Sequence, residues 1–339
     1  MTALPKLVLA KDLSLLGRSP RPLSAAAKAG RLIRIRHGVY VDAEQWKSLE
    51  TWQQYMLRIE AGAETCEAPT VFSHHSGASV WGIPTILRGQ PVHALTTFRG
   101  GGRSRAGIRR HVADPATIDA QELDGLLVTS RVTTVLDLAA FVPFAESIVP
   151  LDHVLKADMH RGLPALTKSG LLDALPGRYS AAAERRVRAA IEFADPKSGS
   201  AGESYSRGLI QVAGFAAPAL QYEIRNSTRL VGYSDFYWDD IRAVGEFDGV
   251  AKYQRDEFLR GRTPGQVVVE EKMREDCIRA TGRNVVRWVW ADLWKAGELE
   301  RKLAAAGVPR RRTRYPRRDA ETVRGHSDVS VAGPSARRE

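Results

Sequence analysis

Three acidic side chains towards the C-terminal end have the types and spacing needed for metal chemistry. Asp235 lies in an apolar run, residues 230–238, and Glu246 and Asp248 lie in the next run, residues 242–248. Because a strand turns every second residue to the same face, we expect Glu246 and Asp248 to project together. Carboxylates on adjacent strands can hold a hard divalent cation. The pattern therefore predicts metal-assisted phosphodiester hydrolysis.

The neighbouring segments predict the elements that position these acids. Helical patterns are expected at residues 203–213, 266–281 and 291–306, and strands at 220–224, 230–238, 242–248 and 285–290. The order α-β-β-β-α-β-α places a mixed sheet between helices. We expect this domain to span residues 202–308, after a Pro/Gly/Ser-rich linker at 194–201.

This segment resembles the PD-(D/E)XK nuclease superfamily, near its very-short-patch-repair-like branch, over about residues 200–300. The resemblance rests on Glu203 in the first helix, Asp235, the run Glu246-Phe-Asp248-Gly, the run Lys272-x-Arg274-x-Asp276, and Gly282 ahead of Val285-Val-Arg287-Trp288. It implies a restriction-endonuclease-like core and a metal-dependent DNA endonuclease.

The resemblance also implies roles for individual residues. Asp235 and Glu246 would bind Mg²⁺ or Mn²⁺, and Glu203 would be a further ligand or would orient water. Lys252 is the lysine best placed to stabilise the developing charge. Arg274 and Arg287 would clamp flanking phosphates. The predicted catalytic set is therefore Glu203, Asp235, Glu246, Asp248 and Lys252.

The sequence departs from the pattern of the nuclease superfamily at one position, which leaves two alternatives for its activity open. The superfamily's usual lysine lies two residues after the strand acid, where this sequence has Asp248. Lys252 could compensate from the next turn; otherwise the fold would bind DNA without cutting it. The acids could also be exposed or paired with basic side chains, since a carboxylate in an apolar strand is costly without a partner.

Positive charge is concentrated at the two ends of the chain. The formal net charge is +11; residues 1–45 carry +5, residues 309–339 carry +5, and the remainder is nearly neutral. Localised basic charge indicates a polyanion partner, although a solubilising surface has the same composition. Residues 309–339 have almost no apolar periodicity, and we expect a disordered basic tail there.

The N-terminal residues 1–48 predict a winged helix-turn-helix. Two short helices, at residues 11–16 and 23–29, precede a hairpin formed by 32–36 and 39–41. The second helix would enter the major groove and the wing would follow phosphates. The predicted DNA-binding residues are Ser24, Lys28, Arg31, Arg34 and Arg36, together with Arg274 and Arg287. Alternatively, the hairpin arginines only protect a strand edge.

The same stretch resembles the N-terminal domain of AbiEi-type antitoxins. The residues that carry this resemblance are 23–29, Gly30-Arg-Leu-Ile-Arg34 and His37-Gly-Val-Tyr-Val41. In that family the domain binds DNA and represses its own operon. The resemblance implies an antitoxin-like regulator, with a cognate toxin as a partner.

For residues 49–193 the sequence predicts an α+β middle domain. The fold class expected for the whole chain is α/β, with an α+β character overall. Ser73 precedes a helix that ends before Pro84, and the Ser73–His74 pair is expected to be a capped helix start rather than a nucleophile. His74, His75, His93 and His111 show no recognisable zinc spacing. Residues 91–97 and 107–112 predict strands, and the arginine- and glycine-rich segment 99–105 between them predicts either a hairpin tip or a DNA contact.

Two functions therefore remain open from the sequence, whereas the basic charge at both ends argues against a third, a toxin-binding module without DNA contact. The first is a Mg²⁺-dependent endonuclease targeted to double-stranded DNA by the winged helix, in bacterial or phage-encoded defence, with a methyltransferase as a possible partner. The second is an antitoxin-like regulator that uses the nuclease fold without catalysis. No apolar run reaches the roughly 18 residues of a membrane span, and two distant cysteines fit a reducing cytoplasm. A homodimer is possible, although no heptad seam indicates one.

Overall fold

A computed structural model describes residues 4–66, 69–97, 107–226, 230–249 and 264–311. The chain divides into two compact units, which are described separately. The first comprises Met1–Phe141 and His153–Glu192, and the second comprises Val142–Asp152 and Phe193–Glu339. The segment 142–152 thus belongs to the second unit, although the sequence places it inside a middle domain that ends at 193.

The first unit begins with two helices and a small sheet. α1 (Ala10–Leu15) and α2 (Arg21–Lys28) are followed by β2 (Leu32–Arg36) and β3 (Val39–Asp42), and β1 (Val8–Leu9) completes a three-stranded sheet of order β1-β3-β2. The turn between β2 and β3 contains Gly38 at φ 76°, a left-handed conformation that glycine adopts readily. Val39, Tyr40 and Val41 are buried and form the core of this part.

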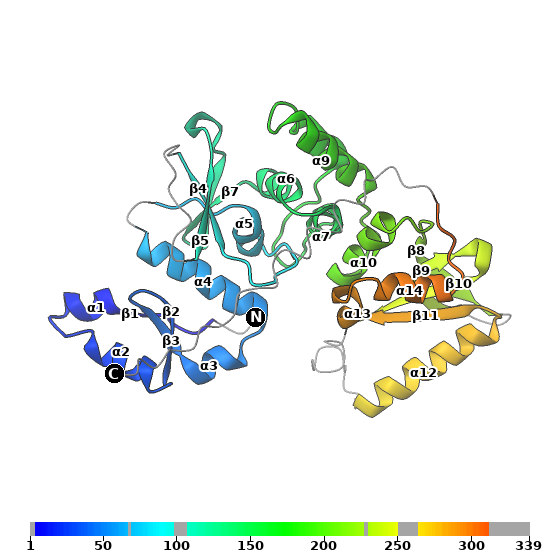
Figure 1. Cartoon of the computed structure of the whole chain (residues 1–339), viewed down its shortest axis with the longest axis horizontal. Coiled ribbons are helices and arrows are strands. Elements are labelled where there is room, and N and C mark those ends of the chain that lie inside the picture. The colour runs from blue at the N-terminus through cyan, green and yellow to red at the C-terminus, as the bar shows by residue number, and fades with distance from the viewer. Residues whose placement is uncertain (1–3, 67–68, 98–106, 227–229, 250–263, 312–339) are drawn as a thin grey trace, which may run out of the picture. The chain divides into compact units, whose positions relative to one another are not determined.

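Two further helices connect this sheet to the rest of the unit (Figure 1). α3 (Ala43–Ser48) begins after Asp42, whose carboxylate accepts from the backbone N–H groups of Glu44 and Gln45. This is the expected N-cap geometry for an aspartate. α4 (Thr51–Thr65) follows, and its buried side includes Tyr55, Leu57 and Ile59.

The remainder of the first unit is built around the short helix α5 (His74–Val80). Its strands are β4 (Val92–Thr96), β5 (Ile108–Val112), β6 (Ala120–Leu123) and β7 (Leu126–Thr129). Phe72 bridges β4 and β7 through its backbone and is 1% exposed. Gly77 allows α5 to approach α6 (Arg131–Phe141), because a Cβ there would lie 3.1 Å from Thr134.

The pairing of β4 with β5 corrects one expectation. The strands are parallel, with Val92 opposite Ile108 and Thr96 opposite Val112. Parallel neighbours need a crossover rather than a tight turn, so β4 and β5 do not form the expected hairpin. The arginines at 99–105 lie outside the described residues.

Helices complete the first unit and begin the second. α6 is capped by Ser130, whose Oγ accepts from the N–H of Thr133. α8 (Lys168–Asp173) and α9 (Ala181–Phe193) follow α7 (Phe144–Val154) in the chain. The first nine residues of α7 belong to the second unit.

The second unit contains a four-stranded mixed sheet of order β11-β10-β9-β8. Its strands are β8 (Ala219–Arg225), β9 (Leu230–Trp238), β10 (Ala243–Asp248) and β11 (Asn284–Val289). β10 and β11 are parallel, whereas β8, β9 and β10 are antiparallel neighbours. With α10 (Ala201–Val212) before the sheet and α12 (Pro264–Ala280) ahead of β11, the element order is the one that the sequence predicts.

The two faces of this sheet contact different helices. On one face, Trp288 donates from Nε1 to Ser206 of α10 at 2.8 Å, and Phe247 lies directly against Gly202 of α10. On the other face, Tyr237 and Val244 pack with Ile278 of α12 in one buried cluster. The sheet is thus enclosed between α10 and α12 (Figure 1).

The C-terminal helical segment differs from the sequence expectation in two ways. The single helix expected at 291–306 is two helices, α13 (Trp290–Trp294) and α14 (Glu298–Ala305), because Gly297 adopts φ 76° between them. The segment 309–311 is not disordered: Pro309 accepts from Ala216 N–H at 2.8 Å, and Arg311 donates to Gly214 at 2.7 Å. Residues 312–339 lie outside the described part.

Candidate functional site

Asp235 and Glu246 are neighbours on the α12 face of the sheet. The antiparallel pairing ends with Gly245 opposite Phe236, and Glu246 and Asp235 are the next residues of the two strands beyond it. Asp235 accepts from the backbone N–H of Phe247 at 2.8 Å, which fixes its carboxylate beside β10. The sequence therefore placed these two acids correctly on adjacent strands.

Each acid of β10 is paired with an arginine. Glu246 is 6% exposed and lies 3.0 Å from the guanidinium of Arg274 on α12. Asp248 lies 3.1 Å from Arg287 on β11, and Arg287 also pairs with Glu275 of α12 at 2.9 Å. Arg274 and Arg287, expected to clamp DNA phosphates, thus contact carboxylates of the protein itself.

Glu203 belongs to the opposite side of the sheet. It lies in the first turn of α10, and Phe247, whose side chain points away from Glu246, packs against the adjacent Gly202. The Glu203 carboxylate accepts from the N–H of Gly199 at 2.7 Å and from the side chain of Gln221 at 3.2 Å. These bonds fix the start of α10.

The expected convergence of Glu203 with Asp235 and Glu246 around one ion is therefore wrong for this arrangement. The physical reason is strand alternation: the β-strand acids face α12, whereas Glu203 is carried by the helix on the other face. Within the described ranges, these acids do not form a group of three close ligands. Lys252 lies outside the described residues, and a magnesium or manganese ion bound by Asp235 and Glu246 alone stays a prediction.

The N-terminal basic residues are mostly exposed. Ser24, Lys28, Arg31 and Arg34 are exposed, whereas Leu23, Ala26 and Ala27 are half-buried. Arg21, Ser24 and Lys28 follow one another at three- and four-residue spacing, which places them on one side of α2. Residues 13–41 contain six Lys or Arg and no Asp or Glu. This segment is therefore basic and contains no acidic side chain of its own.

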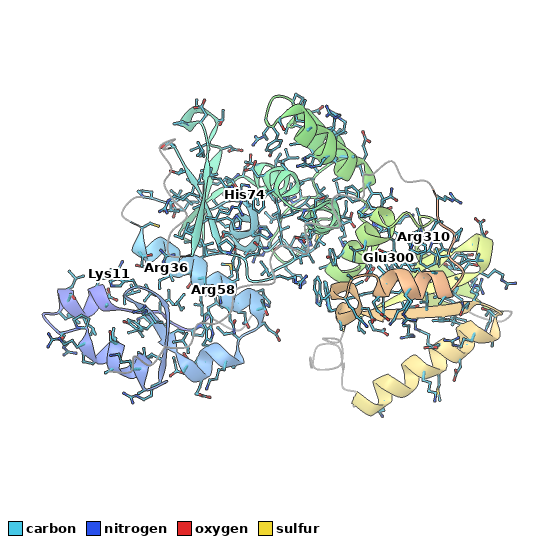
Figure 2. The ribbon with its side chains drawn as sticks, viewed as in Figure 1. Lys11, Arg36, Arg58, His74, Glu300 and Arg310 are labelled. Carbon is cyan, nitrogen blue, oxygen red and sulfur yellow. The ribbon has the colours of Figure 1, made fainter. Side chains whose placement is uncertain are left out.

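Arg36 differs from the other basic residues of this surface. The pairing of β2 with β3 is irregular between Arg34 and Arg36, and the Arg36 Nε donates to Thr65 Oγ1 of α4 at 2.9 Å. Partial burial lowers the pKa of its guanidinium. Lys11, which Figure 2 labels, likewise pairs with Glu64 at the end of α4. Arg36 thus contacts α4 instead of being exposed like Arg34, where the β2–β3 pairing shifts register, and its role in DNA binding stays a prediction.

The structure also assembles a group that sequence spacing did not reveal. His74, His93 and His111 have ring nitrogens within 4.8 Å of one another. No short-range motif connects them, since one begins a helix and two lie on strands. In the sequence, only the frequency of histidine in this region could have indicated such a group. That frequency does not show which side chains lie together.

Comparison with known proteins bears on the N-terminal surface. The model of a family described as "Transcriptional regulator, AbiEi antitoxin" matches residues 5–41, which confirms the resemblance inferred there. Two uncharacterized proteins of Mycobacterium tuberculosis, from strains CDC 1551 / Oshkosh and ATCC 25618 / H37Rv, are each 24% identical over 245 residues. The match spans 71% of this chain and 83% of each relative.

A crystal structure of the RV2827C protein from Mycobacterium tuberculosis is also similar. It shares 16% sequence identity, and the superposition covers 59% of this chain and 75% of that chain with a TM-score of 0.36. The N-terminal match to the antitoxin family is thus the comparison that describes a function. Among the described residues, no helix is both long and apolar enough to span a membrane.

Proposed function

We propose that this chain is a DNA-binding transcriptional regulator of the antitoxin type, whose N-terminal residues form a winged helix-turn-helix. The observation that carries the proposal is the coincidence of the family match with the basic surface. Residues 5–41 contain α1, α2 and the β2–β3 hairpin, and this segment exposes Lys28, Arg31 and Arg34.

The geometry of this segment supports a helix in the major groove. The α2 side that carries Arg21, Ser24 and Lys28 is free of acidic residues, and the Ser24 hydroxyl lies 3.3 Å from Tyr40 OH on β3. The helix is therefore tied to the hairpin at Ser24, while Arg21 and Lys28 on either side of it are exposed. Arg34 on β2 would lie along a phosphate strand as a wing residue.

The partners follow from this function. Double-stranded DNA is the ligand of the basic surface, and a cognate toxin is the partner that the antitoxin resemblance implies. A homodimer would match a palindromic operator. The paired acids of the second unit would then have a structural role, because their charges are compensated inside the protein.

A mobility-shift titration with DNA from upstream of the gene tests the proposal. We expect specific binding that weakens steeply as salt increases, because phosphate contacts release counterions. Equal affinity for the upstream fragment and an unrelated fragment of the same length would contradict a regulatory role.

A metal-dependent endonuclease is the second candidate, and one observation favours it. Asp235 and Glu246 are adjacent on one face of a mixed sheet, as the nuclease resemblance requires. Cleavage of supercoiled plasmid with Mg²⁺ or Mn²⁺, abolished by Asp235→Ala, would establish it in place of the regulator. A methyltransferase is the partner to expect if the protein is an endonuclease.

A further inference from the structure

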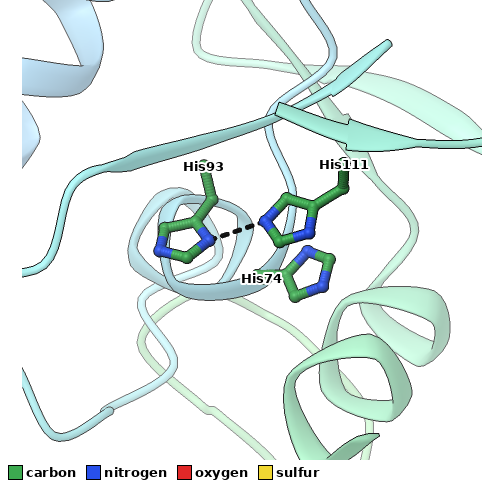
Figure 3. Close-up of side chains that lie close together, drawn as sticks. All are labelled: His74, His93 and His111. Atoms are coloured by element: carbon green, nitrogen blue, oxygen red, sulfur yellow. Dashed lines mark hydrogen bonds between the residues drawn. The ribbon is translucent and has the colours of Figure 1, made fainter. Parts of the chain in front are cut away.

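Three histidines meet around α5 in the first unit. His74 begins α5, His93 lies on β4 and His111 lies on β5 (Figure 3). The rings of His74 and His111 stack with centroids 3.7 Å apart, and Nδ1 of His93 lies 2.9 Å from Nε2 of His111. The edge of Phe141 closes one side of the group, with its centroid 5.2–5.3 Å from each of the three rings.

The fold explains why residues so distant in sequence converge. The parallel register pairs Leu95 with His111, so His93 and His111 are diagonal neighbours on the same face. His74 has φ 50°, which is uncommon for a residue other than glycine. Strain of this kind persists where the surrounding contacts require it, and here it brings the third ring against the other two.

The distances match what an imidazole-bound ion needs. Two zinc-bound nitrogens at about 2.0–2.1 Å from a tetrahedral ion lie about 3.3 Å apart. The His93–His111 nitrogen pair is already at 2.9 Å, and one ligand atom from each of the three rings lies within 4.8 Å of the others. Small ring rotations would therefore bring three nitrogens to coordination distance.

The surroundings of the three rings favour neutral histidines, which can bind a metal, over charged ones. Burial lowers the pKa of His93 to about 2 and that of His111 to about 4, with neighbouring cationic groups, Arg109 among them, adding to the effect. Because His93 is 0% and His74 8% exposed, burial disfavours a charge on these rings, and the neutral imidazole is the form that binds metal. The Ser73 hydroxyl lies 3.0 Å from Nδ1 of His74, orienting this ring and leaving its Nε2 available.

One side of the group opens to a cavity of about 830 Å³. His74 and His111 form part of its wall, beside Arg109 and the acids Asp119 and Asp137. A water molecule could therefore reach an ion held by the three rings from this side. Three protein ligands with one accessible position are typical of zinc sites that exchange a ligand.

We propose that His74, His93 and His111 form a three-histidine site for Zn²⁺ or a similar imidazole-binding divalent ion, with its fourth position facing the cavity. The ion would join α5 to β4 and β5 and would replace the direct contact between His93 and His111. The proposal does not depend on DNA binding.

The test uses the full-length chain without a histidine tag, stripped of metal by a chelator. Calorimetric titration with Zn²⁺ should show one ion per chain, and Co²⁺ should give visible absorption bands of a tetrahedral site. His93→Gln and His111→Gln should each weaken binding at least about tenfold, since even supporting residues of a metal site contribute 10- to 100-fold.

His160→Gln is the matched control, because His160 is an exposed histidine of the same unit. It should bind Zn²⁺ like the original chain. Circular dichroism establishes that each variant is folded, and if His111→Gln does not fold, the milder His74→Asn variant is titrated instead. A chain that takes up no Zn²⁺, or a folded variant that binds it as tightly as the original, would show that the rings only stack.

Discussion

Arg274 on α12 lies 3.0 Å from Glu246 on β10, in the position where a divalent cation was expected beside that carboxylate. Glu246 is almost fully buried, so the guanidinium compensates its charge where water cannot. The same helix contributes Glu275, which pairs with Arg287. α12 is therefore connected to the sheet by charge as well as by the apolar contact of Ile278.

Glu246→Gln tests whether this pair is structural. The substitution leaves Arg274 without its counter-charge, and we expect a loss of about 1–3 kcal/mol in the free energy of unfolding, since Arg274 is partly exposed. Urea denaturation measures this loss. Specific DNA binding should remain, because the substitution lies in the second unit. A variant that is as stable as the original and has lost a Mg²⁺-dependent cleavage activity would reverse the assignment in favour of the nuclease.

Arg34→Ala and Arg36→Ala should have unequal effects on DNA binding. Arg34 is exposed, so its removal should reduce the slope of log affinity against log salt by about 1. Arg36 donates to Thr65, so its removal should change the slope less and the stability of the first unit more. Binding titrations at several salt concentrations compare the two. If both variants reduce the salt dependence of binding equally, Arg36 contacts DNA as Arg34 does.

The buried pair of Asp152 and Arg207 should be important for the second unit. The two side chains are 1% and 6% exposed and lie 2.6 Å apart, and Asp152 also accepts from the N–H of Asp195. Asp152→Asn should cost about 3–5 kcal/mol, because it leaves a buried guanidinium unpaired. Asp240→Asn removes an exposed partner of Arg311 in the same unit and should change stability little. Similar midpoints in urea for both variants would contradict this account.

Gly202→Ala should destabilise the contact between α10 and the sheet. An added Cβ would lie 1.9 Å from the ring of Phe247, which is itself 4% exposed and cannot move into solvent. We expect a loss of about 1–3 kcal/mol from overpacking. Phe247→Leu should recover part of that loss in the double variant, because it removes the clashing ring atoms. Strictly additive losses in thermal denaturation would show that the two residues do not compete for the same space.

Local pattern was sufficient for much of the fold. The helix expected at 203–213 is α10, although it begins two residues earlier, where Ser200 accepts from the N–H of Glu203. The β2–β3 hairpin followed from β-branched runs around His37-Gly38. The alternation of Glu246 with Phe247 was also predictable, since the side-chain period of a strand is two.

The sequence by itself determined which residues carry charge, which segments are helices or strands, and that the N-terminal surface is basic. Only the tertiary structure decided which side chains meet. Glu203 was expected beside Glu246, but the face that a helix covers depends on contacts such as Gly202 with Phe247, which no local pattern encodes. His74, His93 and His111 converge through a parallel strand register and the placement of α5, and both arise only when distant segments pack together.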